Sequence, residues 1–218
     1  MTIRDPEQEK QAAAEAAAAL VEAGMLVGLG TGSTVAFLLE ALARRSLDLR
    51  CVATSPRTEA AGRELGLRVE PFEGLDRLDI AIDGADQVDP ACWLVKGGGA
   101  AHTREKIVAA AADRFVVIAS SDKQVEAIAP PIPLELLAYG LDATLRRLGA
   151  VELRDVPPSP DGGVIADYLG LVDDPAELSA WLAGTPGVVE HGLFPPALVS
   201  EVLVARGGEI ERLAPRQS

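Results

Sequence analysis

The fold is indicated first by the stretch Met25-Leu-Val-Gly-Leu-Gly-Thr-Gly-Ser-Thr34. Its apolar first half predicts a short buried strand, and the apolar side chains of 34–44 recur at helical spacing. A glycine-rich turn between a strand and a helix exposes backbone N–H groups at the positive end of the helix dipole, which attracts phosphate. The turn lacks the Gly-Lys-Ser/Thr of a Walker loop, and a dinucleotide fingerprint would need glycine in place of Ser33. The stretch therefore predicts an anion-binding turn, although glycine for turn geometry alone also explains it.

The alternation of strand and helix continues on both sides of this stretch. Apolar runs predict strands over 25–29, 49–53, 69–72, 78–82 and 114–119. Helical patterns cover 8–23, 34–44, 58–65 and 102–112. Strands that alternate with helices form mostly parallel sheets with helices on both faces. We therefore expect an α/β domain over 1–129.

The pattern changes after the chain-breaking segment Pro130-Pro-Ile-Pro133. The expected elements are a helix over 134–148, strands over 151–154 and 163–168, a helix over 174–184 and a strand over 188–190. The second helix has an Asp cap and Pro175 at its first position. This order suits a small α+β domain over 130–198. An apolar strand over 199–205 is expected to return to the main sheet, so that 199–218 belong to the first domain.

Composition excludes several classes of function. The 33 Asp and Glu residues exceed the 20 Lys and Arg residues, which gives a formal net charge of −13. So acidic a chain has no basic excess for binding a nucleic acid or an anionic membrane. The two cysteines cannot form a disulfide framework, and 1–6 lack signal-peptide features, so we expect a cytoplasmic protein. Neither a nucleic acid nor a membrane is expected as a partner.

Two aspartates follow another predicted strand, in Asp79-Ile-Ala-Ile-Asp-Gly-Ala-Asp86. Asp83 stands at the strand end, the edge at which ligands bind in open α/β sheets. Asp83 and Asp86 flank a two-residue turn, so both carboxylates can point into one cleft, where proximity would separate their pKa values. A solvated Asp-Gly turn, with Asp86 as a cap, is the simpler alternative.

The third unusual loop is Lys96-Gly-Gly-Gly-Ala-Ala-His-Thr-Arg-Glu-Lys106. Three consecutive glycines cost backbone entropy, and close approach of the main chain to a ligand would explain them. Lys96 could neutralise a developing oxyanion. Glu105 falls near the start of the next helix, where the helix dipole favours a carboxylate. Taken alone, Lys96 is equally well a surface ammonium, and Glu105 a residue that only decorates a helix start.

Together the three loops supply a phosphate cradle, two carboxylates, an ammonium and a further carboxylate, which fits proton shuttling on an anionic sugar. The set does not suit a metal centre, because the only histidines, His102 and His191, show no metal-ligand spacing. Nucleophilic chemistry lacks an evident His base. Cys51 and Cys92 are interpreted as small buried side chains. We therefore expect neither a metal nor a cofactor.

These motifs resemble the type A ribose-5-phosphate isomerase family. The blocks 30–34, 79–86, 96–106 and Asp122-Lys-Gln-Val125 stand in the family's order and spacing. The segment His191-Gly-Leu-Phe194 is similar to one near the end of the family's small domain. The likeness covers nearly the whole chain. It implies a Rossmann-like α/β fold with a mostly parallel sheet, a small α+β (ferredoxin-like) domain, and a homodimer or homotetramer.

The resemblance also implies a reaction, the metal-independent interconversion of D-ribose 5-phosphate and D-ribulose 5-phosphate through a cis-enediolate, in the non-oxidative pentose phosphate pathway. Glu105 matches the family's general base, which moves a proton between C2 and C1 of the sugar. Asp83, Asp86 and Lys96 match a polar cluster that assists ring opening, proton movement between O1 and O2, and enediolate stabilisation. The implied substrate-binding positions are Thr31, Gly32, Ser33, Thr34, Asp83, Gly84, Ala85, Asp86, Lys96, Gly97, Gly98, Gly99 and Lys123, with Lys10 as a looser match.

Three positions and one turn depart from the family's pattern. The turn is Pro160-Asp-Gly-Gly163 of the small domain, where an Asn-Gly type turn is more common. Gln87 stands where Glu is common, His102 where a bulky apolar residue is frequent, and Pro56 in a variable segment. None of them belongs to the acid–base set, so they bear on contacts and assembly more than on the reaction.

Three other functions compete with the isomerase: a sugar-phosphate sensor, an amino-sugar phosphate deaminase or lactonase, and a coenzyme A transferase subunit. A sensor would usually follow a DNA-binding segment, and the residues before the glycine-rich turn leave no room for a helix-turn-helix. A deaminase or lactonase would need a His-containing acid–base set, which the two histidines do not supply in matching places. In a transferase, Glu105 would be a nucleophile rather than a base.

Overall fold

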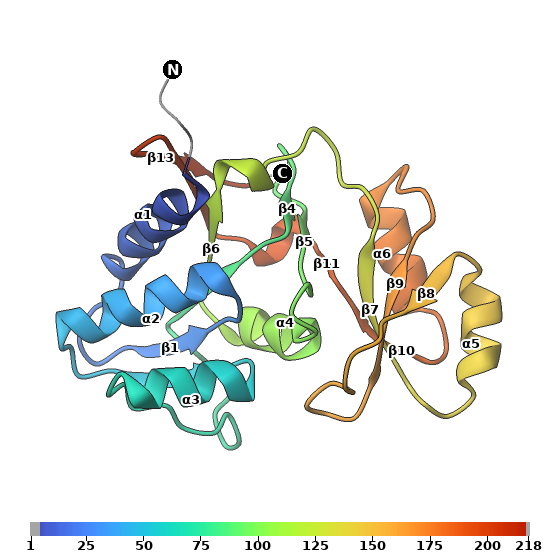
Figure 1. The fold of residues 1–218 in the computed structure, drawn as a ribbon, viewed down its shortest axis with the longest axis horizontal. Helices are drawn as coiled ribbons and strands as arrows, with labels where there is room; N and C mark the ends of the chain where they lie inside the picture. The colour runs from blue at the N-terminus through green and yellow to red at the C-terminus, as the bar shows by residue number, and fades with distance from the viewer. Residues whose placement is uncertain (1–4, 217–218) are drawn as a thin grey trace.

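The computed structural model describes residues 5–216 and centres on a six-stranded sheet (Figure 1). Its strands are β1 (Leu26–Leu29), β2 (Arg50–Ala53), β3 (Ile80–Gly84), β6 (Phe115–Ser120), β12 (Glu201–Arg206) and β13 (Glu209–Leu213). The order is β13-β12-β6-β3-β1-β2, and all neighbouring pairs are parallel except β12 with β13. The expected mostly parallel sheet is therefore confirmed, and β12 returns to it as predicted. Residues 1–4 and 217–218, the outermost parts of the predicted first domain, lie outside the described residues.

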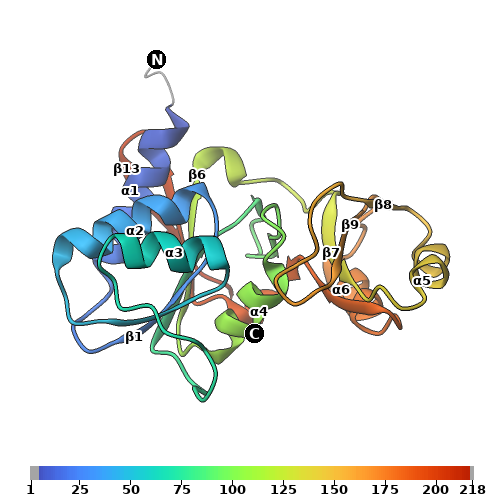
Figure 2. The same cartoon turned by 60° about the horizontal axis from the view of Figure 1, so that its bottom comes forward.

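Helices cover both faces of this sheet (Figures 1 and 2). The helices α1 (Pro6–Ala18) and α2 (Ser33–Arg45) share a core with Val116 and Ile118 of β6. On the opposite face, α4 (His102–Ala111) shares a second core with Phe115 and Val117. All six residues of β6 are buried, which explains its uninterrupted apolar sequence. A further helix, α3 (Pro56–Glu64), follows β2 and packs beside α2.

The parallel strands β1, β3 and β6 end at the same edge of the sheet, and each is followed there by one of the motifs of the sequence analysis. β1 leads through the glycine-rich turn into α2, β3 ends at Asp83 and Gly84, and β6 leads into η1 (Ser121–Lys123). Ligands in open α/β sheets bind at this carboxyl edge. The topology therefore brings together loops that lie far apart in the sequence.

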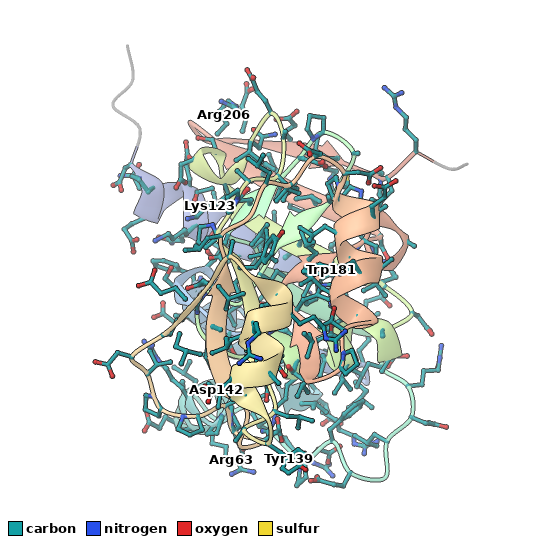
Figure 3. The ribbon with its side chains drawn as sticks, turned by 90° about the vertical axis from the view of Figure 1, so that its right-hand side faces the viewer. Arg63, Lys123, Tyr139, Asp142, Trp181 and Arg206 are labelled. Carbon is teal, nitrogen blue, oxygen red and sulfur yellow. The ribbon has the colours of Figure 1, made fainter. Side chains whose placement is uncertain are left out.

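A second sheet of four antiparallel strands lies at the right of Figure 1. It contains β7 (Ile132–Leu136), β8 (Val151–Leu153), β9 (Val164–Tyr168) and β10 (Val188–His191), in the order β10-β7-β9-β8. Two helices, α5 (Leu141–Leu148) and α6 (Pro175–Ala183), complete this unit, which has a hydrophobic core of its own. Figure 3 looks onto it, with Asp142 labelled on α5 and Trp181 on α6. Asp174 caps α6 by accepting hydrogen bonds from two backbone N–H groups, as its sequence predicts.

The helix predicted over 134–148 is wrong in its first half. Ile132–Leu136 form the strand β7 between β10 and β9, and only Leu141–Leu148 are helical. Every residue of β7 is buried, so packing on both faces outweighs the helix propensity of its leucines. The charge of Glu135 is tolerated there because its carboxylate accepts hydrogen bonds from the hydroxyls of Thr103 and Ser159.

Other short elements also differ from expectation. The strand predicted over 69–72 is reduced to one bridge between Cys51 and Val69. Sequence reasoning missed β13 and a small sheet of β4 (Gln87–Val88), β5 (Leu94–Val95) and β11 (Leu193–Phe194). In this small sheet β11, which follows β10, pairs with β5 immediately before Lys96. None of the helices in 5–216 has the length and hydrophobicity that crossing a membrane requires.

Candidate active site

A cleft at the carboxyl edge of the main sheet gathers the predicted loops. Its walls come from the turn after β1, the loop after β3, the segment Gly97–Gly99 (hereafter the glycine loop) and α4, with one lysine each from α1 and η1. The lining residues are Lys10, Thr31, Gly32, Ser33, Thr34, Gly84, Ala85, Asp86, Lys96, Gly97, Gly98, Gly99, Glu105 and Lys123. Every predicted site residue belongs to this set except Asp83, which is buried against Lys96.

The Lys96 ammonium lies between two carboxylates. Its Nζ is 2.8 Å from Asp83 Oδ2 and 3.1 Å from Glu105 Oε2, and it donates to the Gly84 carbonyl at 2.6 Å. The three charged side chains are each no more than 5% exposed. Since one ammonium cannot neutralise two carboxylates, the cluster either keeps an excess negative charge or binds a proton.

Both carboxyl groups of this cluster have raised pKa values. Burial raises the pKa of Glu105 to about 8; repulsion from Asp83 adds to the rise, and Lys96 opposes it. Burial also raises the pKa of Asp83, against the effect of Lys96 and of the backbone N–H groups of Gly84 and Thr31. For Lys96, burial lowers the pKa, but attraction to Asp83 and Glu105 outweighs burial, so the net change is upward and the side chain stays an ammonium.

The position of Asp83 explains a glycine in the first motif. Asp83 Oδ1 accepts hydrogen bonds from the N–H groups of Thr31 at 3.1 Å and Gly84 at 2.7 Å. A Cβ atom on Gly30 would lie only 1.9 Å from the carboxyl carbon of Asp83. Any side chain at position 30 would therefore displace this carboxylate. The glycine-rich turn serves the approach of Asp83 as well as the start of α2.

Asp86 holds the glycine loop. Its Oδ2 accepts a hydrogen bond from the Gly98 N–H at 2.8 Å. A Cβ atom on Gly98 would lie 2.9 Å from Asp86 Oδ1, and one on Gly97 would lie 2.7 Å from His102 Nδ1. Gly97 also has a φ of +106°, a conformation that favours glycine. The glycines therefore allow the loop to pass close to its neighbours. The carboxylate that shares Lys96 with Asp83 is that of Glu105.

The start of α2 supplies donors for an anion. Ser33 is the first residue of α2, and among the described residues no side chain caps this helix. Its first backbone N–H groups are therefore free to bind a ligand. Lys10 and Lys123 line the same cleft, and Lys10 also pairs with Glu7 at 2.6 Å. Arg206, labelled with Lys123 in Figure 3, hydrogen bonds to Gln124, the residue that follows Lys123.

Sequence reasoning missed a group of hydroxyls around Thr31. Thr31 Oγ1 lies 2.9 Å from Thr54 Oγ1, 2.8 Å from Ser55 Oγ and 3.2 Å from Thr58 Oγ1. The Thr58 hydroxyl also donates to the Gly30 carbonyl at 2.9 Å. The signal for this group is the polar segment 54–58, which directly follows the strand that neighbours β1. These hydroxyls fix the side chain and backbone of the turn that lines the cleft.

Phe194 of β11 is a second residue that sequence reasoning did not assign. Its ring centroid lies 5.5 Å from Lys96 Nζ and 5.0 Å from Lys106 Nζ, and the side chain is fully buried. An aromatic face at this distance attracts an ammonium. Lys106 itself joins α4 to β10, because it donates to the Glu190 carboxylate and the His191 carbonyl, both at 2.7 Å.

The three single-residue departures from the family's pattern lie outside the acid–base cluster. Gln87 exchanges two hydrogen bonds with the backbone of Ala129, and Pro56 is the first residue of α3. His102 is fully buried against Gly97, and burial lowers its pKa to about 4, so it stays neutral. The described residues include no group of three or more His, Cys, Asp or Glu side chains placed to bind a metal ion.

The cysteines are buried and free, as the sequence predicts. Burial raises the pKa of the Cys51 thiol to about 12, with a smaller effect from Glu70. Burial likewise raises the pKa of Cys92. Thiols with raised pKa values are poor nucleophiles at neutral pH, which agrees with a packing role.

A buried proton-sharing cluster beside an uncapped helix start, at the ligand-binding edge of an α/β sheet, defines an enzyme of acid–base chemistry on a small anionic substrate. Comparison with protein families gives the particular type. The chain belongs to the ribose 5-phosphate isomerase A (phosphoriboisomerase A) family, whose family model matches residues 50–209.

Individual relatives extend the match over almost the whole chain. The ribose-5-phosphate isomerase A of Methanosarcina acetivorans is 41% identical, and the alignment covers 96% of this chain and 95% of that protein. The crystal structure of ribose 5 phosphate isomerase A from Neisseria gonorrhoeae is 31% identical, with a TM-score of 0.93 over 98% of this chain and 99% of that one. A D-ribose-5-phosphate isomerase in complex with phospho-erythronic acid is 32% identical, with a TM-score of 0.90 over 97% and 100% of the two chains. These structures confirm the predicted fold class.

Proposed function

We propose that this protein interconverts D-ribose 5-phosphate and D-ribulose 5-phosphate, a step of the non-oxidative pentose phosphate pathway. The observation that carries the proposal is the Lys96 ammonium between the buried carboxylates of Asp83 and Glu105. The complex of a 32% identical relative with phospho-erythronic acid supports a ligand of this kind, because that compound joins a phosphate to a short hydroxylated carbon chain.

In this proposal the sugar phosphate binds by its phosphate group at the start of α2. The backbone N–H groups and hydroxyls of 31–34 donate hydrogen bonds, and Lys10 and Lys123 neutralise the charge. Gly84 and Ala85 form the adjoining wall of the cleft. Anchoring the phosphate holds the reacting carbons next to Glu105, which removes much of the entropic cost of the reaction.

Glu105 is the general base of the proposed reaction. It takes the proton from C2 of the aldose and returns it to C1 through a cis-enediolate, and the same group works in reverse on the ketose. A pKa of about 8 suits this task, because a general base is most effective when its pKa lies near the working pH.

Lys96 and the N–H groups of the glycine loop stabilise the enediolate. Fixed donors in a buried site offset the charge that develops on the substrate oxygens. Asp83, which orients Lys96, and Asp86 assist ring opening and the movement of a proton between O1 and O2. Because Lys96 supplies the positive charge, the proposed reaction uses neither a metal ion nor an organic cofactor.

We also propose a cytoplasmic homodimer or homotetramer whose small-molecule partner is the sugar phosphate. The acidic composition supports the absence of nucleic acid and membrane partners. Exposed apolar side chains such as Tyr139 and Leu171, 93% and 81% exposed, leave surface for contacts between subunits.

The decisive experiment is an isomerase assay on purified protein in the presence of EDTA. Wild-type protein should convert ribose 5-phosphate to ribulose 5-phosphate, and Glu105→Gln should lose about two to four orders of magnitude in kcat. The matched control is Glu64→Gln, which changes an exposed residue at the end of α3 and should keep full activity. Near-normal turnover of Glu105→Gln would remove the base from this scheme, and inactivity of the wild type would refute the proposed function.

A further inference from the structure

Arg154 reaches from the four-stranded sheet to the backbone of the glycine loop. It follows β8, and its Nη1 donates to the Gly97 carbonyl at 2.8 Å and lies 3.4 Å from the Gly98 carbonyl. Its other face is fixed by Asp167 of β9, which accepts from Nε at 2.7 Å and Nη2 at 2.6 Å. Both side chains are less than 20% exposed. The two hydrogen bonds to Asp167 use Nε and Nη2 of the guanidinium, so that Nη1 points at the glycine loop.

The loop that receives this contact has little stiffness of its own. Three consecutive glycines have the largest backbone freedom of any tripeptide, so their conformation must be set by contacts. The Ala100 N–H closes a turn on the Gly97 carbonyl at 3.0 Å, and the Gly98 N–H binds Asp86 at 2.8 Å. Gly98 and Gly99 are otherwise exposed. A contact that fixes the carbonyls of Gly97 and Gly98 therefore fixes the direction of the N–H groups that follow them.

Peptide geometry makes this coupling direct. In a trans peptide the C=O and the next N–H point in opposite directions. Holding the Gly97 carbonyl on Arg154 keeps the Gly98 N–H on Asp86, on the far side of the peptide plane. The Gly98 carbonyl lies near Arg154, so by the same geometry the Gly99 N–H points away from Arg154. Gly99 belongs to the loop that lines the cleft.

We propose that Arg154, held by Asp167, is a positioning residue that orients the peptide planes of the glycine loop for the enediolate side of the cleft. The inference rests on the proposed function for its effect on turnover, while its effect on the loop is independent of that function. It assigns the four-stranded sheet a part in the reaction, through a side chain that does not line the cleft.

The chain offers a matched control for this proposal. Arg104 of α4 forms the same type of two-bond pair with Asp161, at 2.8 Å for both bonds. That pair also joins the segment before the catalytic glutamate to the four-stranded unit, but it is more exposed and is not seen to bond the glycine-loop carbonyls. Loss of Arg104 therefore tests the general effect of breaking a contact between α4 and the four-stranded unit.

The experiment compares Arg154→Ala, Arg154→Lys, Asp167→Asn and Arg104→Ala with the wild type. We expect Arg154→Ala to lower kcat about 10- to 100-fold, because a small misplacement of donors is costly, while KM changes less than about threefold. Competitive inhibition by inorganic phosphate should stay unchanged, since its donors lie at the start of α2. Arg154→Lys should recover only part of kcat, because an ammonium cannot make the fork and the carbonyl contact together. Asp167→Asn should fall between the wild type and Arg154→Ala, and Arg104→Ala should match the wild type.

Amide hydrogen exchange of Gly98, whose N–H is bonded to Asp86, is followed by NMR and separates this inference from the proposed function. Exchange should be at least about fivefold faster in Arg154→Ala than in Arg104→Ala, whatever reaction the protein catalyses. Equal exchange rates in these two variants, or a kcat loss in Arg104→Ala as large as that in Arg154→Ala, would overturn the inference. If the loop loosens but the wild type does not isomerise ribose 5-phosphate, the proposed function fails while the holding of the loop by Arg154 stands.

Discussion

Replacing Glu105 with Gln should stabilise the protein at alkaline pH. The carboxyl has an ordinary pKa of 4.5, and burial raises its folded-state pKa to about 8. Between these two values the unfolded chain has released the proton and the folded chain still binds it, so the stability of the wild type falls as pH rises. Below the lower value the group is protonated in both states and costs nothing, and above the upper value the full cost persists.

The size of the effect follows from the same interval. Each pH unit between the ordinary and the folded-state pKa costs about 1.4 kcal/mol of unfolding free energy, so the total approaches about 5 kcal/mol. This total is an upper bound on the stability that Glu105→Gln can gain. A neutral amide at this position would lose the attraction to Lys96 and leave the ammonium paired with Asp83 alone. We therefore expect the unfolding free energy of Glu105→Gln, relative to that of the wild type, to rise by about 2–5 kcal/mol from the acid side to the alkaline side.

Urea unfolding measured at several values from about pH 5 to about pH 9 tests this reasoning, with the exposed Glu64→Gln variant as the control. The difference in unfolding free energy between Glu105→Gln and wild type should grow steadily with pH, whereas the control should run parallel to wild type. Parallel curves for Glu105→Gln would refute a raised pKa in the folded state and would leave the glutamate an ordinary ionised carboxylate. The pH profile of kcat/KM should rise over the same interval, because the base must be ionised to act.

Three further outcomes are expected. Gly30→Ala should lower kcat by at least about 100-fold in the isomerase assay, because the new Cβ would overlap the Asp83 carboxyl; retention of activity would show that this carboxylate can move freely. Glu9→Ala should raise the KM for the sugar phosphate about 5- to 50-fold with a smaller change in kcat, because Glu9 holds the Ser121 N–H and hydroxyl at the start of the segment that carries Lys123. An unchanged KM would separate that segment from binding. Cys51 should resist thiol reagents in native protein at neutral pH and react after unfolding, since burial raises its pKa to about 12; rapid native labelling would contradict its packing.

The residues that carry the chemistry were predictable because each occupies a loop with an unusual composition after a strand. Asp83 ends a continuous apolar run, and consecutive glycines follow Lys96, so pattern and position agree. Their mutual distances were not predictable from spacing. The contact between Lys96 and Glu105 depends on where α4 starts, and the raised pKa of Glu105 depends on its burial by the surrounding fold.

The parts that escaped prediction are those set by long-range contacts. β7 contains leucines and a glutamate that favour a helix when taken alone, and only the strands on either side make it extended. Phe194 belongs to a two-residue strand, too short to give a periodic signal. Arg154 stands in a segment rich in proline and charge, and nothing in its sequence shows that its partner atoms are carbonyls distant in the chain. Local patterns cannot encode such pairings.

The return of β12 to the main sheet has a consequence for the order in which the protein can assemble. β6 is buried along its whole length and pairs with β3 on one side, but its other neighbour is β12, which the ribosome makes only after the entire four-stranded unit. Until then one edge of an apolar strand lacks its partner, and such edges favour association with other chains. The small unit is therefore complete in sequence while the large one is unfinished, and completion of the sheet that carries the cleft waits for the last strands to be synthesised.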